Sequence, residues 1–173
     1  MSATQVTPAV NGLLQELEQE AATTRRLLER VPQDGLAWKP HARSMSLGQL
    51  ALHIATMPGN IAGMSQRSPF PLPEFVQPAA EDAAALPRML DDSVAAARGI
   101  LGAMDEAALG RAWSVVRDGR ELMTLPVGAM LRMLMLNHWY HHRGQLSVYL
   151  RELDVPLPSI YGPTADENPF AAG

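Results

Sequence analysis

The sequence predicts an all-α fold, a four-helix bundle formed by one domain that spans residues 1–173. Hydrophobic residues make up 47% of the chain and aromatic residues only 5%, so the apolar content is mostly Ala, Leu and Met, which favour helices over strands. Four long segments repeat apolar residues at the three- and four-residue spacing of amphipathic helices. Stretches rich in proline or glycine separate them, and a chain of this length can bury a sizeable core.

The first two helices have clear sequence signals. One apolar face predicts a helix from about residue 8 to residue 30. The second helix, over residues 46–66, begins at Ser46 and Gln49, which can satisfy each other's backbone donors as a capping box. Pro58 should kink or interrupt this second helix, because proline lacks a backbone donor.

The second half of the chain is more varied. A long crossover with four prolines, residues 67–78, leads to a third helix expected over residues 81–104. An alternating run at residues 113–125, broken by Asp118-Gly119, predicts a small hairpin against the bundle. The fourth helix should run from about residue 124 to residue 153, and the irregular tail that follows should either pack over one end of the bundle or stay mobile.

Charge and composition exclude several classes of protein. The net charge is −4 and the 14 Lys and Arg residues are scattered, which argues against binding to nucleic acid or to an anionic membrane. No window approaches the roughly 18 apolar residues of a membrane span, and the N-terminus lacks the features of a signal peptide, so we expect a cytoplasmic protein. The chain has no cysteine, so nitrogen and oxygen atoms must bind any metal.

The fourth helix carries three of the five histidines, within the stretch NHWYHHRGQLSVYL. At roughly 100° per residue, His138 and His142 lie on one face in the core seam, whereas His141 is rotated to one side and Arg143 should face outward. Rings four residues apart on one helix converge, as they do when two imidazoles share a metal. His138 and His142 are therefore candidate metal ligands, and His141 is a weaker one.

A third candidate ligand comes from the second helix. His53 shares a stripe with Leu50 and Met57, so it points toward the core. With His138 and His142 it could form a three-nitrogen site whose open position takes water or substrate, as in catalytic metal sites. The alternative is that each histidine is a core residue bonded to a carbonyl. Burying three unpaired rings would cost roughly 1 to 3 kcal/mol each, which favours the metal.

Three further residues have predicted roles. Gly144 lies in mid-helix, where glycine costs about 1 kcal/mol relative to alanine, and this suggests a close approach by a neighbouring helix or a dimer partner. Gln145 and Tyr149 share the histidine face and either bond a ligand or seal the core, and we favour the second role. His41, in the loop before the second helix, should be solvated.

Two strings of the sequence resemble a known family. LGQLALHIATMPGN and HWYHHRGQLSVYLRELDVPLPSIYG, in a four-helix chain of this length, are similar to the DinB-like superfamily of helical-bundle proteins. The resemblance spans nearly the whole chain, and its specific parts are the histidine of the second helix and the HxxxHRGQ string of the last. It implies an up-down-down-up bundle, often dimeric, with a divalent metal held by three histidines. Those ligands fall on His53, His138 and His142.

The resemblance also implies an activity. Members of the superfamily catalyse S-transfer and isomerisation with low-molecular-weight thiols, and others catalyse metal-dependent hydrolysis. We therefore expect a metal-dependent enzyme, in the first place a thiol-dependent S-transferase that acts on a small electrophile. The chain has no cysteine, so a small thiol would supply the sulfur.

Several alternatives remain open on the sequence. Hydrolysis ranks second, because no acidic residue lies on the helix face from His138 to Tyr149, and a non-catalytic, stress-associated metal-binding bundle ranks third. Zinc or nickel is the expected metal, with iron or manganese as alternatives, because imidazole suits several metals. The expected partners are a small-molecule substrate and a second copy of the chain in a homodimer.

Overall fold

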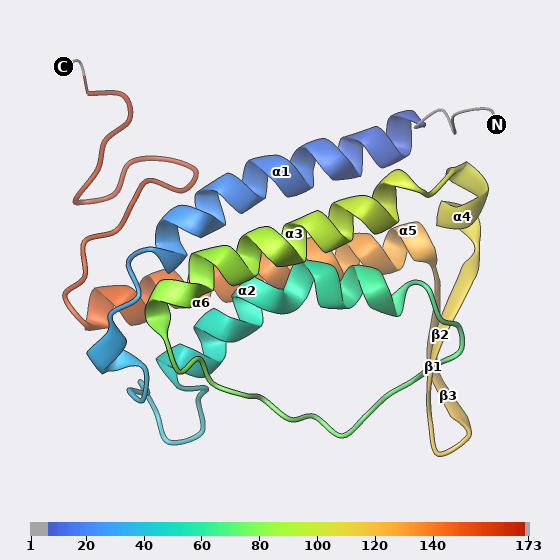
Figure 1. The fold of residues 1–173 in the computed structure, drawn as a ribbon, viewed down its shortest axis with the longest axis horizontal. Helices are drawn as coiled ribbons and strands as arrows, with labels where there is room; N and C mark the ends of the chain where they lie inside the picture. Colours follow the sequence, from blue (N-terminus) through green and yellow to red (C-terminus); the bar gives the residue numbers. More distant parts are fainter. Residues whose placement is uncertain (1–6, 172–173) are drawn as a thin grey trace.

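The computed structural model describes residues 7–171 and shows long helices side by side with a small sheet at one end (Figure 1). The predicted domain also includes residues 1–6 and 172–173, which lie outside the described part. The start of the N-terminal stretch that was considered for a signal peptide lies outside it too. The helices are α1 (Pro8–Leu28), α2 (Leu47–Met64), α3 (Leu86–Gly102), α4 (Glu106–Gly110), α5 (Val127–Met130) and α6 (His138–Glu152). The strands are β1 (Phe70–Pro71), β2 (Ala112–Arg117) and β3 (Arg120–Pro126).

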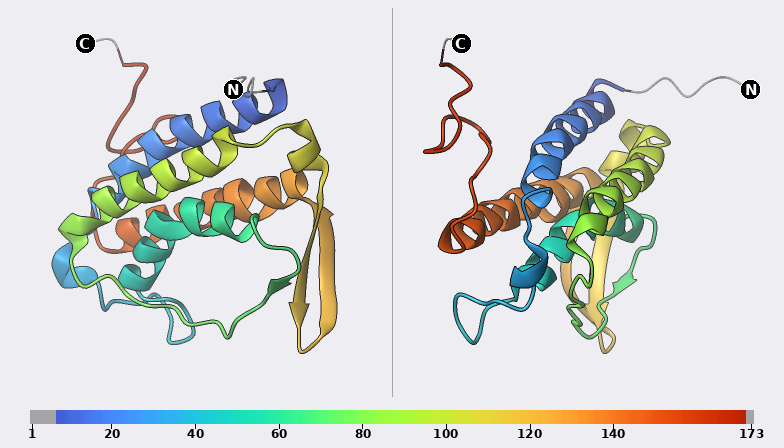
Figure 2. Two further views of the ribbon diagram at one scale, coloured as in Figure 1. Left: turned by 45° about the vertical axis from the view of Figure 1, so that its right-hand side comes forward. Right: turned by 60° about the vertical axis from the view of Figure 1, so that its left-hand side comes forward.

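The predicted four-helix bundle is confirmed. In Figure 1, α1 runs from right to left, α2 and α3 run from left to right, and the rod made of α5 and α6 returns to the left, which is the up-down-down-up order. The two turned views in Figure 2 show the same directions. Apolar side chains from all four rods form one buried cluster. Within residues 7–171, no helix combines the length and the apolar character that crossing a membrane requires.

The predicted hairpin is present, and a third strand joins it. β2 and β3 pair antiparallel, and the turn between them has positive φ at Asp118 and Gly119 (51° and 75°). β1 pairs parallel with β2, and the amide of Leu72 donates to the carbonyl of Val116 at 2.8 Å. The sequence gives no sign of β1, because two residues of a proline-rich crossover are too short to show an alternating pattern.

Two predicted helix starts are wrong. Thr124 lies in β3, opposite Ser114, so the last helical rod begins at Val127 and not near residue 124. The third helix begins at Leu86 and not at residue 81, because a 3₁₀ turn at Ala83–Ala85 precedes it. The short helix α4, which Asp105 caps, was not predicted.

α2 continues through Pro58 and bends, so proline does not interrupt it (Figure 1). Proline has no N–H to donate to the carbonyl of Ile54, four residues earlier. The indole N–H of Trp139, on α6, donates to that carbonyl at 3.0 Å. On the other side of the bend, the amide of Gly59 donates to Ser93 Oγ, on α3, at 2.8 Å. Trp139 of α6 thus supplies the hydrogen bond that proline removes, and Ser93 of α3 adds a second bond at the bend.

A π-helical stretch, Leu131–Asn137, lies directly before α6 and changes which residues face the core. The constant angle of about 100° per residue does not hold across a π-helix. The most deeply buried residues of α6 lie one position beyond His138 and His142: they include Trp139, which is fully buried, and Arg143, which is 1% exposed. The prediction that Arg143 faces outward is therefore wrong.

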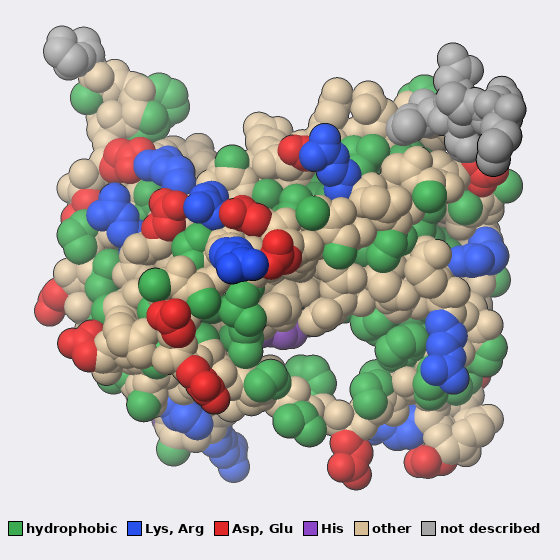
Figure 3. Space-filling model, in the orientation of Figure 1, with side chains coloured by type: hydrophobic (Ala, Val, Ile, Leu, Met, Phe, Trp, Pro, Cys, Tyr) green, Lys and Arg blue, Asp and Glu red, His purple; other side chains and the backbone are tan. Residues whose placement is uncertain are grey.

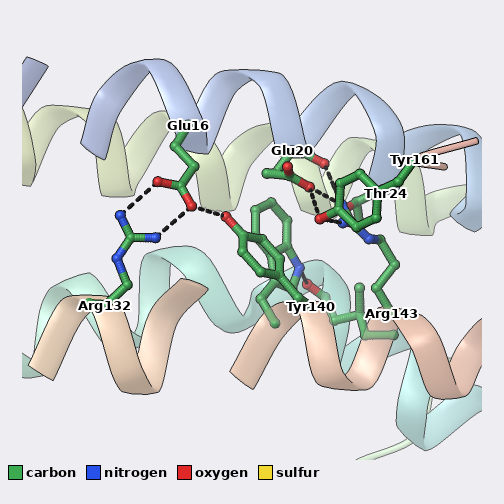
Figure 4. A network of polar contacts seen from close by, with 9 residues as sticks. Glu16, Glu20, Thr24, Arg132, Tyr140, Arg143 and Tyr161 are labelled. Carbon is green, nitrogen blue, oxygen red and sulfur yellow. Dashed lines mark hydrogen bonds and ion pairs between the residues drawn. The ribbon is translucent and has the colours of Figure 1, made fainter. Parts of the chain in front are cut away.

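The buried Arg143 guanidinium pairs with a carboxylate of α1 (Figure 4). Its Nη1 lies 2.6 Å from Glu20 Oε2 and 3.2 Å from Thr24 Oγ1, and its Nη2 donates to the hydroxyl of Tyr161. The hydroxyl of Tyr161 in turn donates to Glu20 Oε2 at 2.9 Å. A buried charge requires such partners, so this cluster fixes α6 against α1 and the C-terminal tail.

The tail packs back over the bundle, one of the two predicted arrangements. Arg26 of α1 pairs with Glu167 at 2.5 Å, and Arg151 of α6 pairs with Asp166. These two pairs are solvent-exposed and contribute little individually. Together with Tyr161 they hold the tail against α1 and α6.

Gly144 has no close neighbour within the described chain. A Cβ atom added at this position would meet no other heavy atom within 4 Å, so a neighbouring helix does not explain the glycine. The close helix approach lies instead at Gly59, where an added Cβ would come within 2.9 Å of the carbonyl oxygen of Ser93. α2 and α3 therefore touch at a point where only glycine fits.

Substitution of Gly59 should show this close approach. Gly59→Ala should destabilise the protein by roughly 1 to 3 kcal/mol, because the new methyl group would meet the backbone of α3. The matched control is Gly99→Ala on α3, where an added Cβ meets nothing within 4 Å. That control should stabilise the helix by about 0.5 to 1 kcal/mol. Urea unfolding of the two variants measures both changes, and equal stabilities would contradict the analysis.

Candidate metal centre

Three histidines from two helices meet between α2 and α6. One ring nitrogen each of His53, His138 and His142 lies within 4.8 Å of the other two. Nε2 of His138 and Nε2 of His142 are 2.7 Å apart. The centroid of the His53 ring lies 5.6 Å from that of His138 and 4.7 Å from that of His142. The structure thus brings together all three histidines that the sequence pointed to.

His53 supplies the strongest sign that an ion belongs here. Its Nε2 is buried and has no hydrogen-bond partner among the described residues. Nearly all buried side-chain polar atoms in proteins have a partner, so an unpaired one requires an explanation. The alternative of a core histidine whose Nε2 bonds a carbonyl does not hold for His53. The three rings could hold a divalent metal, because neutral imidazole nitrogen is a common ligand of such ions.

Gln145 of α6 orients the ring of His142. Nδ1 of His142 lies 2.7 Å from Gln145 Oε1, and because an amide oxygen can only accept, this contact favours the tautomer with the proton on Nδ1 and the lone pair on Nε2. Hydrogen bonds of this kind are typical of metal-binding histidines, because they fix the tautomer and the ring orientation.

The predictions for Gln145 and Tyr149 have different outcomes. Gln145 positions a candidate ligand, a role that the sequence analysis missed although its i, i+3 spacing from His142 on one helix face could have shown it. Tyr149 seals the bundle as predicted: its ring packs edge-on against Trp38 with centroids 5.5 Å apart, and its hydroxyl donates to the carbonyl of Met45 at 3.3 Å.

Burial keeps the three rings uncharged. Desolvation, with a smaller effect from the neighbouring His142 and His138, lowers the pKa of His53 to about 4. Desolvation also lowers the pKa of His138 and of His142, and the nearby Leu134 backbone and the Gln145 side chain, respectively, partly oppose these shifts. All three rings are therefore neutral at pH 7, which is the form that binds a metal.

The other two histidines lie outside this group. His141 is exposed, and its ring centroid is 5.0 Å from that of His142, but it does not belong to the set of converging nitrogens. His41 is exposed in the loop before α2, as expected, and its Nδ1 accepts from the amide of Arg43 at 3.1 Å.

A pocket of about 270 Å³ reaches the site at His53. One wall is a face of α2 and the other is the crossover strap, which we define as residues 73–78. In Figure 3 a histidine is visible at the edge of the hollow between the helices and the crossover. Glu74, on the strap, lines this pocket. This carboxylate gives no signal in the sequence, because Glu74 lies in the proline-rich crossover and not on the histidine face of the last helix.

Comparisons with known proteins agree with this architecture. The chain is 27% identical to the uncharacterized protein YrdA of Bacillus subtilis over 162 residues, which covers 91% of each chain. A DinB-like protein from Bacillus cereus has a similar fold, with a TM-score of 0.68, 24% identity and coverage of 87% of this chain and 97% of that one. The DinB-like protein YjoA of B. subtilis also has a similar fold, with a TM-score of 0.66 and 25% identity. That match covers 87% of this chain and 98% of YjoA. The sequence model of the DinB family matches residues 1–169, and the chain therefore belongs to the DinB family.

Proposed function

We propose that His53, His138 and His142 bind one divalent metal, in the first place zinc or nickel, and that the protein is a metal-dependent enzyme. The observation that carries this proposal is the buried, unpaired Nε2 of His53 beside two further imidazole nitrogens. Three neutral ligands leave room for a small molecule to complete the shell, as in catalytic metal sites. The pocket that His53 lines lies beside this site and has room for a small molecule.

Thiol-dependent S-transfer to a small electrophile is the reaction that we propose first. A divalent metal at this site would supply one property, a lower pKa for a thiol or water that it binds. The chain has no cysteine, so a low-molecular-weight thiol would bring the sulfur. Gln145 holds the His142 ring in position, and the fully buried Trp139 keeps water from the side of the site that faces the core.

Glu74 favours hydrolysis as a second candidate. The expectation that hydrolysis ranks behind S-transfer rested on the lack of an acidic residue near the histidines. Glu74 lines the same pocket as His53, from the opposite wall. A carboxylate in this place can accept a proton from water as a general base. A metal-dependent hydrolase therefore remains a specific alternative.

Removal of one imidazole should remove the metal. We expect about one zinc or nickel ion per chain in the wild type, and a loss of more than about 100-fold in affinity in His142→Ala, because two nitrogens hold a divalent ion poorly. Elemental analysis and competition with a chelator measure both values. The matched control is His41→Ala, which should keep the wild-type metal content. Full metal content in a folded His142→Ala variant would refute the assignment.

The metal-free protein should lose stability in mild acid. A histidine in the unfolded chain has a pKa near 6.5, whereas the pKa of His53 in the folded chain is lowered to about 4. Between these values the unfolded chain binds more protons than the folded one, so the free energy of unfolding falls as pH falls through this window. Denaturant unfolding with chelator present, between about pH 5 and 6.5, measures the effect above the range in which carboxylates titrate.

A non-titrating variant is the control for this pH dependence. His53→Gln should show a weaker loss of stability over the same pH range, whereas His41→Gln should follow the wild-type curve. Identical pH dependence in His53→Gln and the wild type would contradict the assigned protonation state.

Turnover distinguishes the candidate reactions. The metal-loaded protein should convert small electrophiles only when a low-molecular-weight thiol is present, and His142→Ala should abolish this conversion. Glu74→Gln should leave S-transfer to an uncharged electrophile within a few-fold of the wild type. If the protein is a hydrolase, the same variant should slow ester or amide hydrolysis by about 100-fold, the usual contribution of a general base. The absence of metal-dependent turnover in both assays would contradict both reactions and favour a non-catalytic metal-binding protein.

A further inference from the structure

The pocket at His53 has two walls of different character. The α2 wall presents residues at helical spacing along one face, among them Leu52, His53 and Thr56. The opposite wall is the crossover strap, which contributes Glu74, Phe75 and four further residues that line the pocket. A ligand between these walls contacts the site on one side and the strap on the other.

The strap is held at both ends. Directly before the strap, the amide of Leu72 donates to the carbonyl of Val116 on β2. Near the end of the strap, Gln49 Nε2 donates to the carbonyl of Gln77 at 2.9 Å. The amide of Ala80 donates to the carbonyl of Gly48 at 3.1 Å. Proline at positions 73 and 78 restricts the backbone between these anchors. The strap is thus a largely preformed wall, and binding to it requires little ordering of the chain.

Glu74 is the only charged residue among the described ones that line this pocket. No lysine or arginine among the described residues contributes to the lining. Glu74 makes no ion pair with any residue in the described range 7–171, so its charge is available to a ligand. On its other side, Glu74 shares a second hollow with Arg117 and Asp118, whose charges oppose each other. Among the described residues, no lysine or arginine side chain lines the His53 pocket to pair with an anionic head on the side of the strap.

Phe75 gives the rim an aromatic surface next to this carboxylate. Its side chain is 75% exposed and lines the same pocket. A cation over an aromatic ring at an exposed site gains a few-fold in affinity, and an exposed ion pair gains a similar factor. An alkylammonium group can use both interactions, because its positive charge pairs with the carboxylate while its methyl or methylene groups lie against the aromatic ring.

We propose that this pocket binds a small molecule with an alkylammonium head against Glu74 and Phe75 and an uncharged, electron-rich end toward His53. The direction of the uncharged end rests on the proposed metal site. A metal cation at the three histidines would repel the positive head of the ligand and attract an oxygen or sulfur atom at its uncharged end. The preference for a cationic head rests on the strap alone. The two parts can therefore be tested separately.

Choline and 3,3-dimethylbutan-1-ol are suitable probes, because they have nearly the same shape and differ by the positive charge. NMR titrations of the full chain, both metal-free and zinc-loaded, should show about fivefold tighter binding of choline in the wild type. Shift changes should centre on Leu52, Thr56 and the strap. Glu74→Gln should bring the two affinities within about twofold, through weaker binding of choline and unchanged binding of the alcohol.

Glu121→Gln, an exposed acidic position on β3, is the matched control and should keep the fivefold preference. Equal binding of the two probes, no saturation by either probe, or a preference that survives in Glu74→Gln would each overturn the proposal. A choline preference in a protein that binds no zinc would support the pocket and refute only the metal site. Zinc binding without a choline preference would refute only the pocket.

Discussion

The hydrogen bond from the indole of Trp139 to the carbonyl of Ile54 determines how the two histidine-bearing helices meet. His53 and His138 are the immediate chain neighbours of these two residues, so a contact between them sets the separation of the rings. Pro58 makes the contact available, because it leaves the Ile54 carbonyl without its partner in the helix. A buried carbonyl without a partner would cost about 1 to 3 kcal/mol, which makes this bond a strong constraint on the packing of α2 against α6. The bend in α2 and the position of the site thus have one cause.

The opposite side of α6 is fixed by charge. Arg143 lies buried between α1 and α6, and Glu20, Thr24 and Tyr161 satisfy its guanidinium (Figure 4). Loss of one member of a buried ion pair is strongly destabilising, because the other charge remains without a partner. Trp139 is hydrogen-bonded to α2 and Arg143 is paired with Glu20 of α1. These two contacts, on two sides of α6, fix the rotation of this helix about its own axis. The face that carries the histidines therefore lies at the boundary of the core and not in its centre.

This boundary position suits both parts of the proposed chemistry. Burial on one side lowers the pKa of the three imidazoles and keeps them neutral, as a metal requires. Exposure on the other side opens His53 to a pocket whose second wall is the strap. The helices supply the candidate ligands, whereas the crossover supplies the only charged side chain among the described residues that line this pocket. Metal binding and substrate choice would then depend on different segments of the chain.

Local patterns in the sequence determined the helical class of the fold, the hairpin and the three histidines. The spacing of His138 and His142 and the stripe that contains His53 are properties of single helices, so they can be found without knowledge of the packing. Arg143 could not be placed in this way, because the π-helical stretch changes the angle between residues and because the partner Glu20 lies 123 residues away. β1 and Glu74 gave no signal, since a proline-rich crossover has no periodicity. Only the tertiary structure decided that this crossover pairs with a strand and faces the histidines, because contacts between distant segments depend on packing and not on local spacing.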